Sequence, residues 1–187
     1  MKLVILAGGK AMRMGEDKAE LSLGNYRLID RVYSRVKTQC NEVLVSGNHD
    51  YGLGLGIVPD SPSGPRGPVA ALYSVMKALS KTDEGFFTVP VDGPNLPHDL
   101  CERLYGDRSS LAESLDGLHQ TFAWWRLDDL KSAFAQVSLS QSVSLLHISE
   151  LCRARHIFWP DELLFYNINT PNDLSAYLTK NAQQDTS

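Results

Sequence analysis

The sequence predicts an α/β protein, a three-layer α/β/α sandwich around a mostly parallel sheet. Short apolar runs bounded by glycine or proline alternate along the chain with segments whose apolar residues recur at helical spacing, which is the pattern of β-α-β units. The run at residues 3–7 is apolar at every position, as expected for a strand buried on both faces of a parallel sheet. A length of 187 residues, with 43% hydrophobic and 21% charged, predicts one globular domain with a sizeable core.

The first three elements form a β-loop-α-β unit. Residues 3–7 are a continuous apolar run that ends at a Gly-Gly pair, which predicts a buried strand. A polar, glycine-containing loop follows, and residues 42–46 form the second short strand. Between them, apolar spacing predicts a helix that contains Leu28, Ile29, Val32 and Val36.

The same alternation continues in the next third of the chain. Residues 56–59 are a short apolar segment, residues 68–79 are predicted as a helix, and residues 85–91 as another buried strand. In open parallel sheets, ligands bind beyond the carboxyl ends of the strands. The loops expected to carry function therefore follow Ala7, Ser46, Pro59 and Val91.

The second half of the chain has weaker patterns. Helices are predicted at 96–105, 127–134 and 171–178, and strands at 120–125 and 163–168. The pair Trp124-Trp125 is bulky for a strand inside a sheet, so at least one ring is expected at a surface or an interface. The polar tail from 181 to 187 is expected to fray. No internal repeat and no linker divides the sequence.

Charge and cysteine content exclude several classes of protein. Lys and Arg number 18 against 22 Asp and Glu, a formal net charge of -4, so no global basic field is available for a nucleic acid. The three cysteines, Cys40, Cys101 and Cys152, include no Cys-x-x-Cys pair, which argues against a disulfide framework or a cysteine zinc site. The sequence shows neither a signal-peptide core nor the roughly 18 apolar residues of a membrane helix. We expect a soluble cytoplasmic protein with neither a nucleic-acid nor a membrane partner.

The loop after the first strand has the features of a phosphate-binding loop. Gly8 and Gly9 follow the strand directly, and glycines there let the backbone pass close to a ligand and direct N–H groups at phosphate or base. The loop then carries three cations, Lys10, Arg13 and Lys18. It is neither a Walker A loop nor a Gly-x-Gly-x-x-Gly dinucleotide motif. A triphosphate site is one interpretation, and a surface loop with incidental Lys and Arg is the other.

The run Leu-Ala-Gly-Gly-x-x-x-Arg-Met-Gly-x-Asp-Lys at residues 6–18 resembles the signature of the molybdenum cofactor guanylyltransferases, the molybdopterin-guanine dinucleotide biosynthesis protein A family. Three further segments resemble that family in the same order. They are an Asp and Gly-Pro-x-Ala region at 58–72, an Asp-Gly-Pro-x-x-Pro region within 89–97, and Asn-x-Asn-Thr-Pro at 167–171. The resemblance spans residues 1–178 and is weakest between 105 and 160.

This resemblance implies a Rossmann-like nucleotidyltransferase fold in a single domain over residues 1–187, with a nucleotide-binding half at 1–100 and an acceptor-binding half at 101–180. It implies transfer of GMP from Mg²⁺-GTP to molybdopterin, release of pyrophosphate, and Mg²⁺ as the cofactor. The expected partners are GTP, molybdopterin and a molybdoenzyme or chaperone that receives the product, and the expected state is a monomer or weak homo-oligomer. Two alternatives stay open: the same chemistry with CTP or a sugar phosphate, and a non-catalytic nucleotide-binding assembly factor.

The resemblance also implies a set of site residues. Those implied to bind nucleotide are Leu6, Ala7, Gly8, Gly9, Lys10, Lys18, Asn48 and Asp60, and those implied in catalysis are Arg13, Lys18 and Asp92. Gly8 favours a guanine base, because relatives that use cytidine tend to carry Ala there and a Cβ would intrude on a purine. From the residues alone, Asp60 is equally suited to start a turn, and Asn48 to be an ordinary loop residue.

Asp92 is the predicted Mg²⁺ ligand. It follows an apolar strand in a loop stiffened by prolines, and protein-bound Mg²⁺ usually takes one or two carboxylates besides phosphate and water. The alternative is a residue that caps the following helix. Two residues depart from the family pattern: Val91 stands where Cys is frequent, so no thiol is needed there, and Ala71 stands where Gly is usual.

Asn167 and Asn169 are the predicted contacts to the acceptor. They alternate along a predicted strand and so share one face, where two amides suit a polar heterocycle such as a pterin, as the resemblance also implies. The alternative is that Asn169 or Thr170 caps the next helix. His119 stands where the family has His-Pro, and it either orients the acceptor or is an ordinary polar loop residue. We find no arrangement typical of covalent nucleophilic catalysis.

Overall fold

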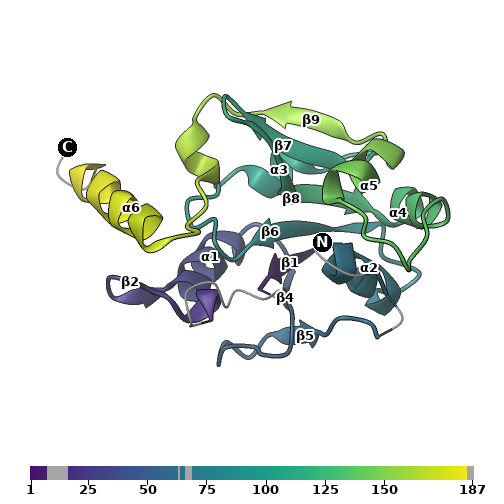
Figure 1. Cartoon of the computed structure of the whole chain (residues 1–187), viewed down its shortest axis with the longest axis horizontal. Coiled ribbons are helices and arrows are strands. Elements are labelled where there is room, and N and C mark those ends of the chain that lie inside the picture. Colours follow the sequence, from purple (N-terminus) through teal and green to yellow (C-terminus); the bar gives the residue numbers. More distant parts are fainter. Residues whose placement is uncertain (8–16, 63, 66–68, 185–187) are drawn as a thin grey trace.

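A computed structural model of the chain describes residues 1–7, 17–62, 64–65 and 69–184. Its central sheet contains the strands β1 (Lys2–Leu6), β4 (Glu42–Ser46), β5 (Gly56–Val58), β6 (Gly85–Pro90), β7 (Ser110–Ser114), β8 (Gly117–Arg126) and β9 (Arg155–Phe158). The strand order is β5-β4-β1-β6-β8-β7-β9 (Figure 1). Within the described sheet, β8 alone runs antiparallel to both of its neighbours. The prediction of a mostly parallel sheet is therefore confirmed.

Helices cover both faces of this sheet. One face carries α1 (Leu28–Val36) and α3 (Leu100–Leu104), and the other carries α2 (Val69–Ala78), α4 (Leu127–Phe134) and α5 (Leu145–Leu151). The buried side chains of β1 alternate between these two layers, because successive residues of a strand point to opposite faces. Leu3 and Ile5 pack toward α1, and Val4 packs toward α2. The result is the three-layer sandwich that the sequence predicts.

A third, smaller core joins the two ends of the chain. It lies between the hairpin β2 (Ser22–Leu23) and β3 (Tyr26–Arg27) and the helix α6 (Pro171–Gln184). The 3-10 helices η2 (Lys18–Glu20) and η3 (Glu162–Phe165) come directly before two of its segments in the chain, and their buried residues Ala19 and Phe165 belong to the core on the α1 side. The buried residues of this core are Leu21, Leu23, Leu28, Ile168 and Tyr177. Because Ile168 and Tyr177 pack here, the C-terminal segment lies beside the turn that carries Lys18.

The predicted elements of the first half agree with the structure to within a residue or two, whereas the second half contains errors. The predicted strand at 163–168 was wrong, because Asp161 accepts a hydrogen bond from the N–H of Leu163 at 3.0 Å and caps the 3-10 turn η3 instead. The helix predicted at 96–105 is limited to α3, and α6 continues to Gln184, beyond the expected start of the frayed tail. The elements that were not predicted are η2 and the β2–β3 hairpin in the first half, and β7, α5 and β9 in the second.

The expectation that a tryptophan lies at the surface was also wrong. Trp124 is 1% exposed and Trp125 is 0% exposed, and they pack into the two opposite cores of the sheet. Each indole N–H donates a hydrogen bond, Trp124 to the carbonyl of Gly106 at 3.0 Å and Trp125 to Oγ1 of Thr88 at 2.9 Å. Gly85 makes room for the pair, because a Cβ built there would lie 2.8 Å from the Trp124 ring.

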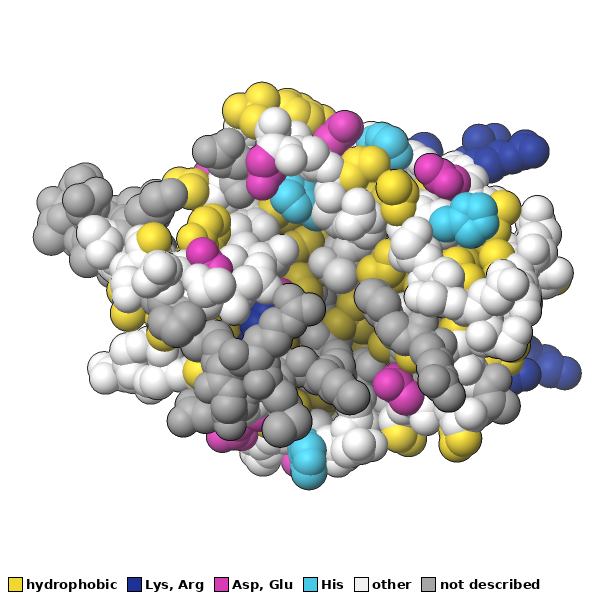
Figure 2. Space-filling model, viewed as in Figure 1, with side chains coloured by type: hydrophobic (Ala, Val, Ile, Leu, Met, Phe, Trp, Pro, Cys, Tyr) yellow, Lys and Arg dark blue, Asp and Glu magenta, His cyan; other side chains and the backbone are white. Residues whose placement is uncertain are grey.

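The surface shows few concentrated charges. On the face in Figure 2, Lys and Arg side chains lie mainly at the right-hand edge, and the described residues form no extended basic cluster there. None of the described helices is both long and apolar enough to cross a membrane. Cys40, Cys101 and Cys152 are all unpaired, as the absence of a disulfide framework predicts.

Candidate active site

Three polar side chains from distant parts of the chain meet at one point. The ammonium of Lys18 on η2 donates to Oδ2 of Asp92 at 2.6 Å and to Oδ1 of Asn169 at 2.7 Å. The side chains of Lys18 and Asp92 are only 17% and 19% exposed, so this ion pair is less screened by water and salt than a surface pair. The structure therefore brings together one residue from each of three motifs that the sequence analysis singled out.

The sheet places Asp92 at the carboxyl end of β6. The N–H of Val91 donates to the carbonyl of Leu6 at 3.2 Å, which continues the β1–β6 ladder one residue past the strands. The carbonyl of Asp92 then accepts from the N–H of Ile168 at 2.8 Å. This second bond attaches the segment that carries Asn169 to the loop that carries Asp92.

Gly93 allows the loop that carries Asp92 to lie directly against the buried ring of Phe122. A Cβ built on Gly93 would lie 2.4 Å from Cζ of Phe122, whose side chain is fully buried. No side chain is accommodated at that distance unless the ring or the loop moves. The position of Asp92 therefore depends on the absence of a side chain at the next residue.

We expect Gly93→Ala to lower the free energy of unfolding by about 1–3 kcal/mol, the usual cost of an added methyl in a close-packed core. Urea denaturation measures it. The double variant Gly93→Ala/Phe122→Leu should lose less stability than the sum of the two single losses, because leucine has no atom at the position of the phenyl Cζ. Strictly additive losses would contradict this account of Gly93.

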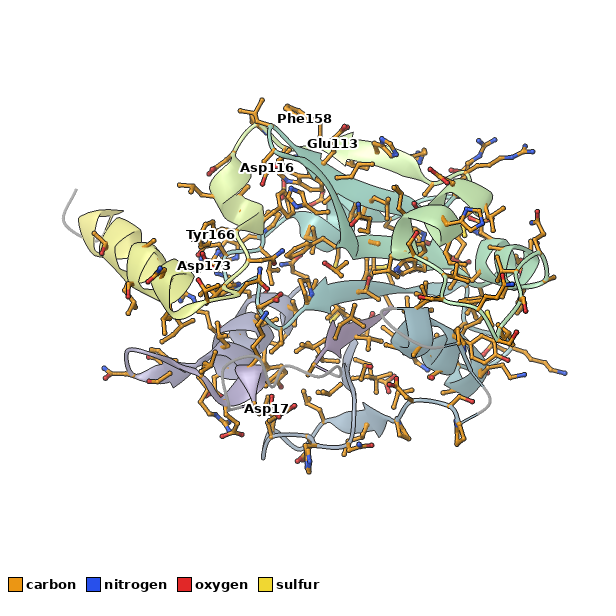
Figure 3. All side chains as sticks on the ribbon, viewed as in Figure 1. Asp17, Glu113, Asp116, Phe158, Tyr166 and Asp173 are labelled. Atoms are coloured by element: carbon orange, nitrogen blue, oxygen red, sulfur yellow. The ribbon has the colours of Figure 1, made fainter. Side chains whose placement is uncertain are left out.

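Helix α6 holds the backbone of Asn169 and leaves its side chain available. Oδ2 of Asp173 accepts from the N–H of Asn169 at 2.9 Å and of Thr170 at 2.8 Å, and Oγ1 of Thr170 accepts from the N–H of Asp173 at 3.1 Å. These reciprocal bonds form a capping box, and the bond from the Asn169 N–H is the first cause that lowers the pKa of Asp173. Figure 3 shows Asp173 beside Tyr166, which donates to its other oxygen at 3.4 Å. The amide of Asn169 thus contacts Lys18 while Thr170 caps the helix.

Asn167 lies on the same segment in a different environment. Residues 167–169 are irregular and not a strand, so the predicted shared strand face was wrong. Oδ1 of Asn167 is buried near Gly93 and has no hydrogen-bond partner among the described residues. A buried acceptor without a donor costs about 1–3 kcal/mol, which makes this oxygen a candidate ligand contact.

The remaining predicted site residues lie along the same edge of the sheet or outside the described residues. Leu6 ends β1, and Ala7 follows it as a buried residue. Asn48 and Asp60 are exposed in the loops after β4 and β5, and the structure gives neither of them a hydrogen bond to the Lys18 cluster. The residues that fall outside the described ranges are Gly8, Gly9, Lys10 and Arg13.

The family model and the curated relatives that match this chain point to the same family. The family model described as "MobA-like NTP transferase domain" matches residues 3–139. The chain belongs to this family. A molybdenum cofactor guanylyltransferase from Cereibacter sphaeroides is 33% identical over 181 residues, with 92% of each chain covered. The resemblance drawn from the sequence motifs is therefore confirmed.

Solved structures of nucleotidyltransferases share the fold of this MobA-like domain. Molybdopterin-guanine dinucleotide biosynthesis protein A from Archaeoglobus fulgidus matches 98% of this chain and 100% of its own, with a TM-score of 0.73 and 20% identity. A 2-C-methyl-D-erythritol 4-phosphate cytidylyltransferase from Thermus thermophilus matches 96% and 97%, with a TM-score of 0.69 and 17% identity. At these identities the likeness concerns the fold alone.

Sequence reasoning missed a second polar cluster in this MobA-like domain. His119 lies on β8 rather than in a loop, and its Nε2 is 2.8 Å from Oγ of Ser114 and 3.2 Å from Oδ1 of Asp116. Ser114 also hydrogen-bonds to Asp116. Both partners meet the same ring nitrogen, unlike a catalytic triad, in which the acid contacts the other nitrogen. The Asp116-Gly117 pair is a hairpin signal that predicts the β7–β8 connection.

The ring of His119 is packed against the segment that leads to Asn167. It stacks on Phe165 with centroids 4.5 Å apart and planes 20° apart, and it meets Phe122 edge-on at 6.1 Å. Burial lowers the pKa of His119, although the Asp116 carboxylate acts in the opposite direction. The neutral ring therefore supports the packing of η3 beside the candidate site.

This pKa shift predicts a pH dependence of stability. Between the lowered folded pKa and the ordinary value of about 6.5, the unfolded chain binds more protons at His119 than the folded chain does, so the free energy of unfolding decreases as the pH falls through that window. His119→Gln removes this contribution, and its stability should change less steeply with pH from about 7 downward. Denaturant unfolding at several pH values measures both slopes. Identical slopes for parent and variant would rule out a neutral buried His119.

The donor atoms of the cluster fit a hard cation. Oδ2 of Asp92 and Oδ1 of Asn169 already converge on a positive charge, the ammonium of Lys18. Among the described residues, no group of three or more His, Cys, Asp or Glu side chains is placed to hold a metal ion. A cation at Asp92 would therefore complete its coordination with phosphate and water, which is how Mg²⁺ is usually bound.

Proposed function

We propose that the chain is a nucleotidyltransferase that transfers GMP from Mg²⁺-GTP to the terminal phosphate of molybdopterin and releases pyrophosphate. The observation that carries this proposal is the Lys18–Asp92–Asn169 cluster, which joins the phosphate-loop motif to a carboxylate and to an amide of the C-terminal motif. Curated relatives named molybdenum cofactor guanylyltransferase, such as the one from Cereibacter sphaeroides, support the choice of nucleotide and acceptor. We propose the cytoplasm as the site of this reaction.

The reaction is a direct displacement at the α-phosphorus. An oxygen of the acceptor phosphate forms a bond to the α-phosphorus of GTP, the bond from that phosphorus to the α,β-bridging oxygen breaks, and pyrophosphate leaves with the bonding electrons. Such chemistry needs little covalent help from the protein, so positioning and charge neutralisation supply most of the acceleration. In this proposal Lys18, together with Arg13 and Lys10, neutralises charge on the triphosphate.

Asp92 is the residue that would hold Mg²⁺. When bound, the ion would neutralise negative charge on the phosphates of the nucleotide. In the described structure, Oδ2 of Asp92 and Oδ1 of Asn169 both accept a hydrogen bond from the Lys18 ammonium. Bound nucleotide would give Lys18 phosphate oxygens as alternative partners and free the Asp92 carboxylate for the cation. The proposal therefore requires Lys18 to exchange partners between the free and the loaded protein.

The pterin side of the acceptor is assigned to Asn167 and Asn169. The buried Oδ1 of Asn167 has no donor among the described residues, and a pterin offers ring and amino N–H groups that match such an acceptor. Asn48, Asp60 and the backbone of the loop at Gly8 and Gly9 are assigned to the nucleotide. Gly8 favours guanine because a Cβ there would crowd a purine.

Pyrophosphate release tests this proposal. Purified protein is incubated with Mg²⁺ and molybdopterin, together with either GTP or CTP. We expect pyrophosphate and a guanine dinucleotide product with GTP, and much less with CTP. Preference for CTP would support the cytidylyltransferase alternative. Turnover with a sugar phosphate in place of molybdopterin would show that the acceptor is a sugar phosphate. Nucleotide binding without pyrophosphate release would support a non-catalytic assembly factor.

A further inference from the structure

We propose that Tyr51 is a positioning residue that holds Lys18 in place for transfer, through the carboxylate of Asp17. This inference deepens the proposed function and rests on the role assigned there to Lys18. Tyr51 is outside every motif identified in the sequence, and it lies in the loop after β4, downstream of Asn48. Tyr51 would thus link the loop after β4, which carries Asn48, to the ammonium of Lys18. In the proposed function both of these contact the nucleotide.

Tyr51 is held at both ends. Its hydroxyl donates to Oδ2 of Asp17 at 3.1 Å, and its backbone carbonyl accepts from Nη2 of Arg27 at 3.0 Å. Arg27 is itself fixed by a two-point contact with Asp30 at 2.8 and 2.9 Å, which anchors it to the first turn of α1. Tyr51 therefore links Arg27, at the start of α1, to Asp17, with its backbone at one end and its hydroxyl at the other.

Asp17 transmits this contact to Lys18. Its other oxygen, Oδ1, accepts from the N–H of Ala19 at 3.0 Å and caps η2, whose first residue is Lys18. Figure 3 shows Asp17 at the lower edge of the molecule, far from Asp116 at the upper edge. A 3-10 turn of three residues has few hydrogen bonds of its own. Its orientation, and with it the direction of the Lys18 side chain, therefore depends on how Asp17 is held.

The backbone at Tyr51 is strained in a way that fits this role. Its φ is 55°, in the left-handed region that residues other than glycine, asparagine and aspartate seldom adopt. Asp50 stabilises the loop, because its two oxygens accept from the N–H groups of Gly52 at 3.0 Å and Gly54 at 3.1 Å. Strain of this kind persists where surrounding contacts fix the conformation, and it clusters at functional sites.

The hydroxyl of Tyr51 is available as a donor at every physiological pH. Burial raises the pKa of Tyr51, and the Asp17 carboxylate raises it further. The ring packs against the core on the α1 side of the sheet. Tyr51→Phe therefore removes one hydrogen bond and leaves the ring packing in place.

Amine labelling tests the inference without any turnover. Parent, Tyr51→Phe and the control Tyr105→Phe, which loses a similar bond from its hydroxyl to Glu84 at 2.9 Å, are briefly treated with an acylating reagent. Peptide mass spectrometry gives the labelling rate of Lys18 relative to the exposed Lys131. We expect this ratio to rise about five- to tenfold in Tyr51→Phe, the factor that corresponds to the net contribution of one ordinary hydrogen bond, and to stay unchanged in Tyr105→Phe. An unchanged ratio in Tyr51→Phe, or an equal rise in both variants, would overturn the inference.

Kinetics separate this inference from the proposed function. With GTP and molybdopterin, Tyr51→Phe should lower kcat about five- to tenfold with little change in the KM for GTP. In a Lys18→Ala background the same substitution should have no further effect, because the residue it positions is gone. Equal effects in both backgrounds would show that Tyr51 acts elsewhere. Failure of the parent to turn over would contradict the proposed function, while the labelling result would still decide the role of Tyr51.

Discussion

Lys18→Ala is expected to lower the turnover of nucleotidyl transfer by about 10²–10³-fold and to change GTP binding far less. The Lys18 ammonium lies within 2.7 Å of two oxygen atoms and its side chain is largely shielded from water, so its charge acts on nearby groups with less screening than that of a surface lysine. In the proposed mechanism its charge is needed most where negative charge develops between the α- and β-phosphates. The effect should therefore appear in kcat.

The measurement is steady-state pyrophosphate release together with a GTP binding isotherm. Lys131→Ala is the matched control, because Lys131 is exposed and pairs with Asp128 at 3.4 Å on α4. We expect the control to match the parent. An unchanged kcat in Lys18→Ala would remove Lys18 from the mechanism, and a parallel loss of binding and turnover would make it a ground-state contact only.

Asp92→Asn should weaken apparent Mg²⁺ affinity and lower turnover by about 10²-fold, because the amide keeps the shape of the side chain and loses the charge that a hard cation requires. The amide oxygen still has the geometry to accept from Lys18, so the fold and the melting temperature should change little. Lys18→Ala should show the opposite behaviour toward the metal. Without the competing ammonium, Asp92 should bind Mg²⁺ at least as well as in the parent.

A Mg²⁺ titration of turnover, with melting temperature measured in parallel, checks this second prediction. Asp128→Asn serves as the control, since that carboxylate is exposed and lies on α4. If the Mg²⁺ titration of Asp92→Asn overlays that of the parent, Asp92 is a loop residue and does not bind the metal.

The strands β1 and β6 in the first half of the fold were predictable because they are largely buried on both faces. All six residues of β6 are buried, so the sequence there is a largely apolar run with Thr88 inside it, a pattern typical of a buried parallel strand. The edge strand β9, in contrast, reads Arg-His-Ile-Phe, and none of its residues is fully buried. Neither alternation nor a continuous apolar run marks such a strand, because its place in the sheet is set by pairing with β7.

The candidate site was predictable in its residues and not in its contacts. Motif order identified Lys18, Asp92 and Asn169, yet the ion pair between residues 74 positions apart and the bond across 151 positions depend on tertiary packing. The link from Arg27 through Tyr51 to Asp17 matches no sequence motif, because it consists of one tyrosine hydroxyl and one backbone carbonyl contact. The capping box at Thr170 and Asp173, however, follows the ordinary Thr-x-x-Asp pattern that starts many helices.

The central claim is that the Lys18–Asp92–Asn169 cluster serves transfer of a nucleotidyl group to an acceptor phosphate. The most direct test follows the phosphorus atoms of GTP, labelled separately at the α and γ positions, in a single turnover with Mg²⁺ and molybdopterin. We expect the α label to move to the molybdopterin product and the γ label to leave as pyrophosphate, with both processes slowed together in Lys18→Ala. Release of the γ label as orthophosphate, with the α label retained on a free nucleotide, would contradict the account.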